Sequence, residues 1–188
     1  LFSILSWWER YSKDTVKRLE IFDDLRTDTH QVCLAGDSKM IDIIEVLKKK
    51  NPTFSELVKN QSIKGIFSSP PYVGLIDYHD QHAYAYDLFG FERKDKMEIG
   101  PLSKGQGREA RDAYVKDIAE VLNNCKKYFV KDFDIFLVAN DKYNLYPDIA
   151  EKTGMKIINQ YKRPVLNRTE RDKGAYSEII FHLKANGK

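Results

Sequence analysis

Residues 63–72 read Ile-Lys-Gly-Ile-Phe-Ser-Ser-Pro-Pro-Tyr, and this stretch decides the fold. A short apolar run that stops at two prolines is typical of a buried strand followed by a turn. The prolines fix two φ angles and remove two N–H donors, and they push Ser69 into an extended conformation. We therefore predict a strand over residues 63–67 and then a rigid segment, residues 69–72, which we call the diproline loop.

The rest of the chain alternates between helical and extended apolar patterns around this strand. Alternation of this kind predicts an α/β fold with a mostly parallel sheet and helices on both faces, and the last two strands can form an antiparallel pair at the C-terminus. Ligands of such sheets bind at the carboxyl ends of the strands, where the diproline loop lies. Helices are expected over residues 2–25, 40–50, 77–91, 110–130 and 145–153, a loop over 92–108, and further strands over 31–34, 134–139, 156–161 and 178–183.

Composition sets the class of protein. The 188 residues are 42% hydrophobic and 31% charged, which fits one globular domain over residues 1–188 with an N-terminal helical segment at 1–28. A net charge of +3 permits a polyanionic partner without requiring one. Cys33 and Cys125 are far apart in apolar surroundings, which predicts two buried thiols in a reducing cytoplasm. No long apolar run or signal peptide is visible, so we expect a cytoplasmic protein without a membrane partner.

The diproline loop is suited to holding an aromatic amine. The Ser69 side chain and the Pro70 carbonyl can accept the two amino hydrogens, which directs the nitrogen lone pair towards an electrophilic methyl group. Tyr72 can stack on the base, a contact worth ~1–3 kcal/mol per base. Such chemistry depends on positioning rather than on a strong general base, and a base in a duplex must first be flipped out. The alternative is an ordinary proline-rich turn after a strand.

The longer segment over residues 66–82 (Ile-Phe-Ser-Ser-Pro-Pro-Tyr-Val-Gly-Leu-Ile-Asp-Tyr-His-Asp-Gln-His) resembles a known motif. It is similar to motif IV and its flank in the prokaryotic DNA amino-methyltransferases of restriction–modification systems. The resemblance implies part of the Rossmann-like fold of S-adenosylmethionine-dependent methyltransferases, and it gives Ser69, Pro70, Pro71 and Tyr72 the role of holding the target amino group. The serine form of the motif is more typical of cytosine-N4 enzymes and the aspartate form of adenine-N6 enzymes. We therefore expect a site-specific cytosine-N4 DNA methyltransferase, with adenine N6 as the alternative.

The same resemblance suggests where the cofactor S-adenosylmethionine binds. Gly36-Asp37-Ser38 resembles the acidic site that contacts the cofactor adenine in this family, which implies cofactor binding by Asp37 and Ser38 together with Ser69. A helix N-cap at Asp37 or Ser38 is a compatible alternative. The glycine-rich cofactor loop of the family is absent, because Gly105-Gln106-Gly107 follows no expected strand. We expect that loop in an upstream segment or a partner chain, and weak or no cofactor binding by this chain alone.

Several residues are candidates for contact with DNA. Asp77 and Tyr78 follow the diproline loop and can line the target pocket. Basic side chains in the two long loops can contact phosphates and base edges, and solvated charged loops are the alternative. These basic candidates are Lys104, Arg108 and Arg111 near the first loop and Arg163, Arg168 and Arg171 in the connection over residues 162–177.

Two further patterns have an ordinary structural interpretation. His79 and His82 are i, i+3 neighbours that could bind a metal, but methyl transfer from a sulfonium needs none, so we expect a polar helix face and no metal. The apolar side chains of the same region are expected in the core rather than in a stacking platform. They are Tyr84, Tyr86, Leu88 and Phe89.

Three other functions stay open at this point. An RNA or protein amino methyltransferase could use a similar diproline edge. A non-catalytic DNA-binding subunit could depend on a partner for the cofactor half. A metal-dependent nuclease built on the two histidines is the most distant alternative.

Overall fold

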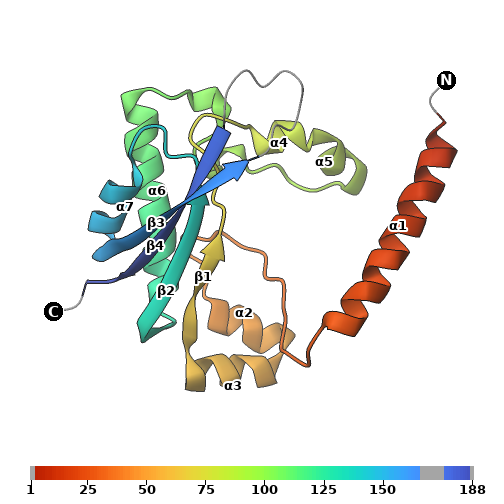
Figure 1. Cartoon of the computed structure of the whole chain (residues 1–188), viewed down its shortest axis with the longest axis horizontal. Helices are drawn as coiled ribbons and strands as arrows, with labels where there is room; N and C mark the ends of the chain where they lie inside the picture. The colour runs from red at the N-terminus through yellow and green to blue at the C-terminus, as the bar shows by residue number, and fades with distance from the viewer. Residues whose placement is uncertain (1–2, 166–175, 187–188) are drawn as a thin grey trace. The chain divides into compact units, whose positions relative to one another are not determined.

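The computed structural model describes residues 3–165 and 176–186, and the chain forms two compact units, Leu1–Cys33 and Leu34–Lys188 (Figure 1). The first unit contains one helix, α1 (Ile4–Leu25), which confirms the helical pattern at the N-terminus. Ser3 caps it by accepting the Ser6 N–H. Its apolar side chains are exposed, and no residue of α1 is buried. None of the described helices combines the length and the apolar character needed to cross a membrane.

The second unit begins with α2 (Ile43–Lys50) and α3 (Pro52–Gln61). Asp42 caps α2 by accepting the N–H groups of Ile44 and Glu45. The helix therefore begins at Ile43, and the predicted N-cap at Asp37 or Ser38 is wrong.

The expected strand over residues 31–34 is also absent: these residues form no strand and pair with none of the four described strands. Cys33, which lies there, is exposed, whereas Cys125 is half-buried. The prediction of two buried thiols is therefore wrong for Cys33.

The sheet has four described strands in the order β1-β2-β4-β3. The strands are β1 (Ile63–Ser68), β2 (Phe129–Ala139), β3 (Met155–Val165) and β4 (Tyr176–Ala185). β1 and β2 run parallel, while β4 is antiparallel to both β2 and β3. The α/β class and the antiparallel pair at the C-terminus are confirmed. The prediction of a mostly parallel sheet is wrong, because β4 enters between β2 and β3 in the opposite direction and makes the sheet mixed.

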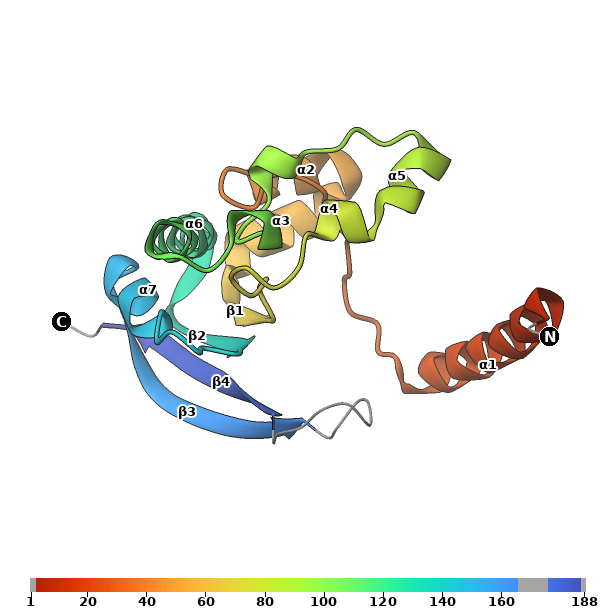
Figure 2. The same cartoon turned by 90° about the horizontal axis from the view of Figure 1, so that it is seen from above.

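The core lies on the face of the sheet that α6 (Arg108–Lys126) and α7 (Tyr146–Lys152) cover (Figure 2). Ile135, Leu137 and Phe181 point into it and are at most 2% exposed. No described helix of the second unit lies against the opposite face, so the prediction of helices on both faces is also wrong. On that face Phe136 stacks on His182 at 4.2 Å between ring centroids, and Phe67 is 76% exposed.

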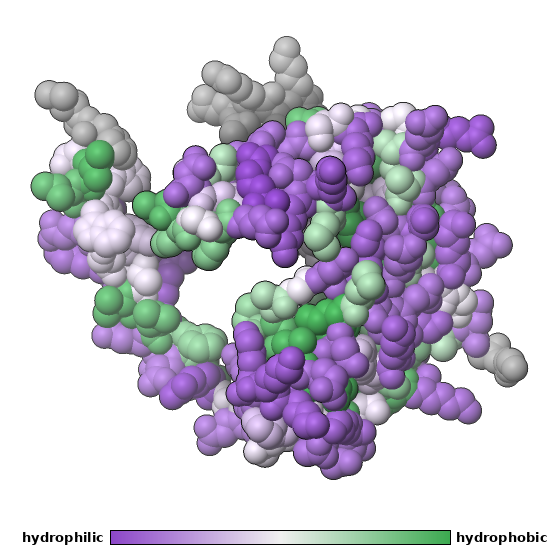
Figure 3. All heavy atoms as spheres, turned by 180° about the vertical axis from the view of Figure 1, so that it is seen from behind, coloured by the Kyte–Doolittle hydropathy of each residue, from purple (hydrophilic) through white to green (hydrophobic). Residues whose placement is uncertain are grey.

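Four short helical segments connect β1 to α6: α4 (Tyr78–Gln81), α5 (Ala83–Phe89), η1 (Asp95–Met97) and η2 (Leu102–Lys104). The helix expected over residues 77–91 is thus divided at His82. Its apolar residues Tyr84, Leu88 and Phe89 are 64–74% exposed, which corrects the prediction that they belong to the core. Figure 3 shows apolar residues reaching the surface among hydrophilic ones on one face of the molecule.

Candidate active site

The diproline loop lies at the carboxyl edge of the parallel strand pair. β1 ends at Ser68, which pairs with Leu137 of β2, so the loop and Asn140 lie at the same edge of the sheet. β4 runs in the opposite direction and begins at this edge, which brings Glu178 beside the loop. The sequence prediction for the position of residues 69–72 is therefore confirmed.

The loop is held from inside the protein at the Pro71 carbonyl. The hydroxyl of Tyr114 on α6 donates to this oxygen at 2.8 Å. Tyr114 is 2% exposed, and burial raises its pKa to about 12, so it remains a protonated donor at neutral pH. Its hydroxyl also lies 3.3 Å from that of Tyr146, whose ring stacks on Phe181 at 4.4 Å. Tyr114 lies in the helix expected over residues 110–130, and the sequence signal for its role is that a buried tyrosine hydroxyl usually has a hydrogen-bond partner.

A second hydrogen bond fixes the aromatic residue of the loop. The Tyr72 hydroxyl donates to Glu178 Oε1 at 2.7 Å, and the Tyr72 ring packs against the hydrophobic core. Glu178 is only 7% exposed, and its other oxygen lies 3.5 Å from Arg163 Nη1. Sequence analysis missed this role of Glu178, although an acid inside an apolar strand pattern is an unusual feature that could have marked it.

The first two residues of the loop keep their acceptors available. Ser69 is exposed and Pro70 is half-buried. Within the described residues, no hydrogen bond occupies the Ser69 hydroxyl or the Pro70 carbonyl, whereas the Pro71 carbonyl is already used by Tyr114. The arrangement can therefore present two neighbouring hydrogen-bond acceptors, one for each hydrogen of an exocyclic amino group.

Replacing Tyr114 with phenylalanine tests this support. The ring would still fill the core, but the half-buried Pro71 carbonyl would lose its donor, at a cost of about 1 kcal/mol in stability, the usual net value of one hydrogen bond. We expect lower thermal stability, measured by thermal denaturation. Tyr128→Phe is the matched control, because the Tyr128 hydroxyl contacts the start of α2 at Asp42 and Ile43 and not the diproline loop. Equal behaviour of both variants would contradict the prediction.

The segment after the loop is fixed by the connection to α6. The Gly74 N–H donates to the Gly100 carbonyl, and Gln106 Nε2 donates to the Gly74 carbonyl at 3.0 Å. Gly74 has φ +61°, and a Cβ there would lie 2.5 Å from the Gly105 carbonyl oxygen, so only glycine fits. Asp77 accepts the backbone N–H and the hydroxyl of Ser103, both at 3.0 Å. The Asp77 carboxylate thus holds two segments together, which gives it a structural role in addition to the predicted one.

Two of the three predicted cofactor residues, Asp37 and Ser38, line a cavity of about 300 Å³. Asp37 opens a turn in which its side chain accepts the Lys39 N–H at 3.0 Å. Opposite it, His79 Nδ1 and Glu98 Oε2 are 3.1 Å apart and both side chains are largely buried. The full lining is Gly36, Asp37, Ser38, His79, Lys94, Met97 and Glu98, so the cavity brings Asp37 and Ser38 together but does not include Ser69.

The two histidines of the possible metal site contact different partners. His79 pairs with Glu98 and stacks on Tyr86 at 5.2 Å, while His82 is exposed and lies edge-on to Tyr84. Over residues 3–165 and 176–186, no group of three or more His, Cys, Asp or Glu side chains is placed to hold a metal ion.

The predicted DNA contacts are distributed unevenly. Tyr78 is 39% exposed six residues after the diproline loop, Lys104 is exposed in the connection to α6, and Arg108 is exposed at the first residue of α6. Arg163 pairs with Glu178 and so lies close to Tyr72. Arg168 and Arg171 lie outside the described residues.

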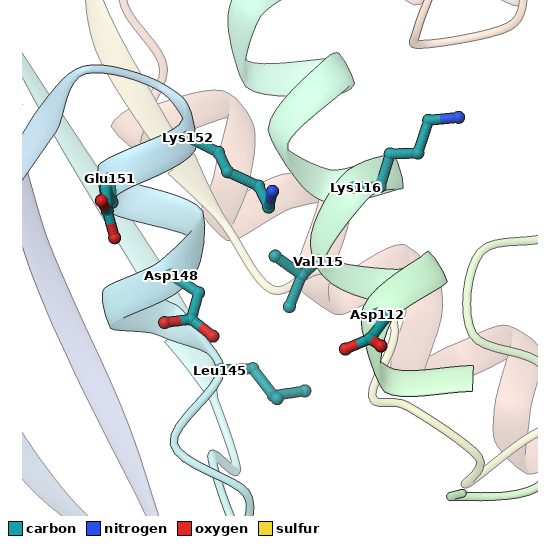
Figure 4. A pocket seen from close by; sticks show the side chains of 7 residues that line it. All are labelled: Asp112, Val115, Lys116, Leu145, Asp148, Glu151 and Lys152. Atoms are coloured by element: carbon teal, nitrogen blue, oxygen red, sulfur yellow. The ribbon is translucent and has the colours of Figure 1, made fainter. Parts of the chain in front are cut away.

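A larger cavity of about 740 Å³ lies between α6 and α7 (Figure 4). Its side chains come from these two helices and from Leu145, and they carry both signs of charge. The lining contains no residue of the diproline loop or of the turn at Asp37, so this cavity is separate from the candidate site. It consists of Asp112, Val115, Lys116, Leu145, Asp148, Glu151 and Lys152.

An α/β unit with a mixed sheet and a diproline loop at the carboxyl edge of its parallel strands is consistent with a methyltransferase fold. The chain is 50% identical over 182 residues to Type II methyltransferase M.MjaII of Methanocaldococcus jannaschii, a match of 97% of this chain and 34% of that protein. The chain thus spans about a third of the length of this curated relative. No family model and no solved structure matches it. The relationship confirms the resemblance to restriction–modification methyltransferases that residues 66–82 predicted.

Proposed function

We propose that this chain is the target-base part of a DNA methyltransferase that uses S-adenosylmethionine and modifies cytosine N4. The observation that carries the proposal is the pair of available acceptors, the Ser69 hydroxyl and the Pro70 carbonyl, on a loop held rigid by Tyr114 and Glu178. The sequence relationship to a type II methyltransferase supports the reaction class. Adenine N6 is the alternative target.

The residues around Asp37 fit part of the proposed cofactor. A carboxylate at Asp37 and a hydroxyl at Ser38 can accept hydrogen bonds from an adenosine group, and ligand pockets begin at volumes of about 300 Å³. Bound S-adenosylmethionine would supply an electrophilic methyl carbon on a positively charged sulfur. The remainder of its binding site, including the glycine-rich loop, is proposed to come from an upstream segment or a partner chain.

In the proposed mechanism the protein positions the target amino group and does not activate it by removing a proton. Ser69 Oγ and the Pro70 carbonyl accept the two amino hydrogens, and the Tyr72 ring supports the face of the flipped base. Holding both hydrogens would direct the nitrogen lone pair towards the methyl group that a bound cofactor would supply, and the amino proton released on transfer would pass to solvent.

Replacing Ser69 with alanine tests this assignment. The variant loses one acceptor, and a hydrogen bond of about 1–1.5 kcal/mol corresponds to roughly a tenfold slower transfer. Transfer of labelled methyl groups from S-adenosylmethionine to DNA by the intact protein measures the change. Ser68→Ala is the matched control, since Ser68 belongs to β1 and pairs with Leu137.

Analysis of the labelled nucleoside separates N4-methylcytosine from N6-methyladenine, and parallel reactions with tRNA and protein test the other methyl acceptors. Undiminished transfer by Ser69→Ala would remove the proposed mechanism. Label found only in RNA or protein would remove the proposed substrate.

A further inference from the structure

Two cations share one aromatic ring at the edge of the sheet that carries the diproline loop. The Arg111 guanidinium lies 4.8 Å from the centroid of the Tyr143 ring, and the Lys142 ammonium lies 5.3 Å from it. Within the part of the chain that the structure describes, neither cation takes part in an ion pair. Two cations held against one ring without an ion-pair partner create a local positive potential that favours an anion.

Both cations are held in place by contacts that lead to the diproline loop. The Tyr143 ring packs against the hydrophobic core, and its hydroxyl donates to Gln106 Oε1. Gln106 in turn donates to the carbonyl of Gly74, two residues after Tyr72. The turn that carries Lys142 and Tyr143 follows β2, whose carboxyl end lies at the same edge as that of β1. The positive site and the proposed base pocket are therefore part of one connected structure.

A third cation extends the positive surface along α6. Arg108 lies three residues before Arg111, so both project from the same side of the first helical turn. Its side chain is 90% exposed and approaches Asp112 only to 3.8 Å, a surface contact too weak to neutralise it.

We propose that Arg111 and Lys142 form a phosphate clamp for the nucleic-acid backbone beside the flipped base, with Arg108 at its margin. The inference rests on the proposed function, because it takes a polynucleotide as substrate. Arg111 offers a planar fork that matches two phosphate oxygens, and Lys142 adds a mobile point charge. The clamp does not distinguish one base sequence from another. It fixes the position of the nucleic-acid backbone while the diproline loop holds the base.

The salt dependence of DNA binding tests the clamp directly. Arg111→Gln and Lys142→Gln each remove one charge, so the slope of log affinity against log salt should fall by about 1 per variant and about 2 in the pair. Fluorescence anisotropy with a labelled duplex and with a labelled single strand measures this slope. Both cognate and unrelated sequences should lose affinity to a similar extent.

Matched variants keep the result interpretable. Lys116→Gln removes a charge from the same helix, where Lys116 is 73% exposed and lines the separate cavity with Asp112, and it should leave the slope unchanged. Arg111→Lys keeps the charge but loses the fork, so the slope should stay while affinity falls severalfold. Affinity for S-adenosylmethionine should not change in any of these variants.

Three outcomes would overturn the clamp: a wild-type slope in the Arg111→Gln, Lys142→Gln pair, an equal loss in Lys116→Gln, or no binding of wild-type protein to either nucleic acid at low salt. If the Arg111→Gln or Lys142→Gln variant instead bound S-adenosylmethionine more weakly, the two cations would be assigned to the carboxylate of the cofactor. Because binding is measured without turnover, the clamp is tested even if methyl transfer to DNA fails. Reduced slopes with no transfer would uphold the clamp and remove the proposed reaction.

Discussion

Replacing Tyr72 with alanine is expected to slow the proposed methyl transfer to DNA by about 10- to 100-fold, the effect of losing a stacking contact of ~1–3 kcal/mol. The Tyr72 ring packs against the core, and its hydroxyl is bound to a buried carboxylate, Glu178, at 2.7 Å. The ring therefore needs no ordering when a base arrives, and its contact is available in the transition state. Initial rates of label transfer under saturating cofactor measure the change.

Tyr72→Phe separates the ring from its hydroxyl. This variant keeps the stacking surface and loses the bond to Glu178, so it should stay within about tenfold of the wild-type rate. Thermal denaturation of both variants shows whether the fold is retained. A phenylalanine variant as slow as the alanine variant would contradict stacking and would assign the effect to the hydroxyl. A wild-type rate in Tyr72→Ala would remove Tyr72 from the site altogether.

Local sequence signals were enough to find the diproline loop but not what supports it. Two prolines after an apolar run determine backbone geometry within a few residues, so the position of residues 69–72 could be predicted. The bonds that fix this loop join residues 43 and 106 positions apart in the chain. No periodicity encodes such a pairing, so the sequence places Tyr114 in a helix and Glu178 in a strand without showing that either supports the loop.

The fold shows the same division between what is local and what depends on partners. Periodicity located β1 and most of α6 and β2, but β2 begins at Phe129, five residues before the expected strand and inside the helix expected over residues 110–130. Strand direction depends on neighbours, so the insertion of β4 between β2 and β3 could not be foreseen. Burial likewise depends on what covers a surface: the apolar residues of α5 suggest a core position, yet no described element of the second unit covers them.

Replacing Phe181 with alanine will lower the free energy of unfolding by about 3–5 kcal/mol, the cost of deleting a buried phenylalanine side chain. Phe181 is 2% exposed at the centre of the core, and its ring lies parallel to that of Tyr146 at 4.4 Å. The stacked pair itself contributes about 0.5–1.5 kcal/mol beyond the buried area. Because the Tyr146 hydroxyl lies 3.3 Å from that of Tyr114, the cavity would also loosen the donor that holds Pro71.

Urea denaturation followed by circular dichroism measures this loss, and the chain offers a matched control. Phe67 also belongs to a strand of the sheet but is 76% exposed on the face opposite the core, so Phe67→Ala should cost less than about 1 kcal/mol. If the rate of the proposed methyl transfer falls more in Phe181→Ala than the loss of folded protein accounts for, the core is connected to the diproline loop. Similar losses of stability in the two variants would show that the face bearing Phe67 is buried in solution and would contradict a core built on one side of the sheet.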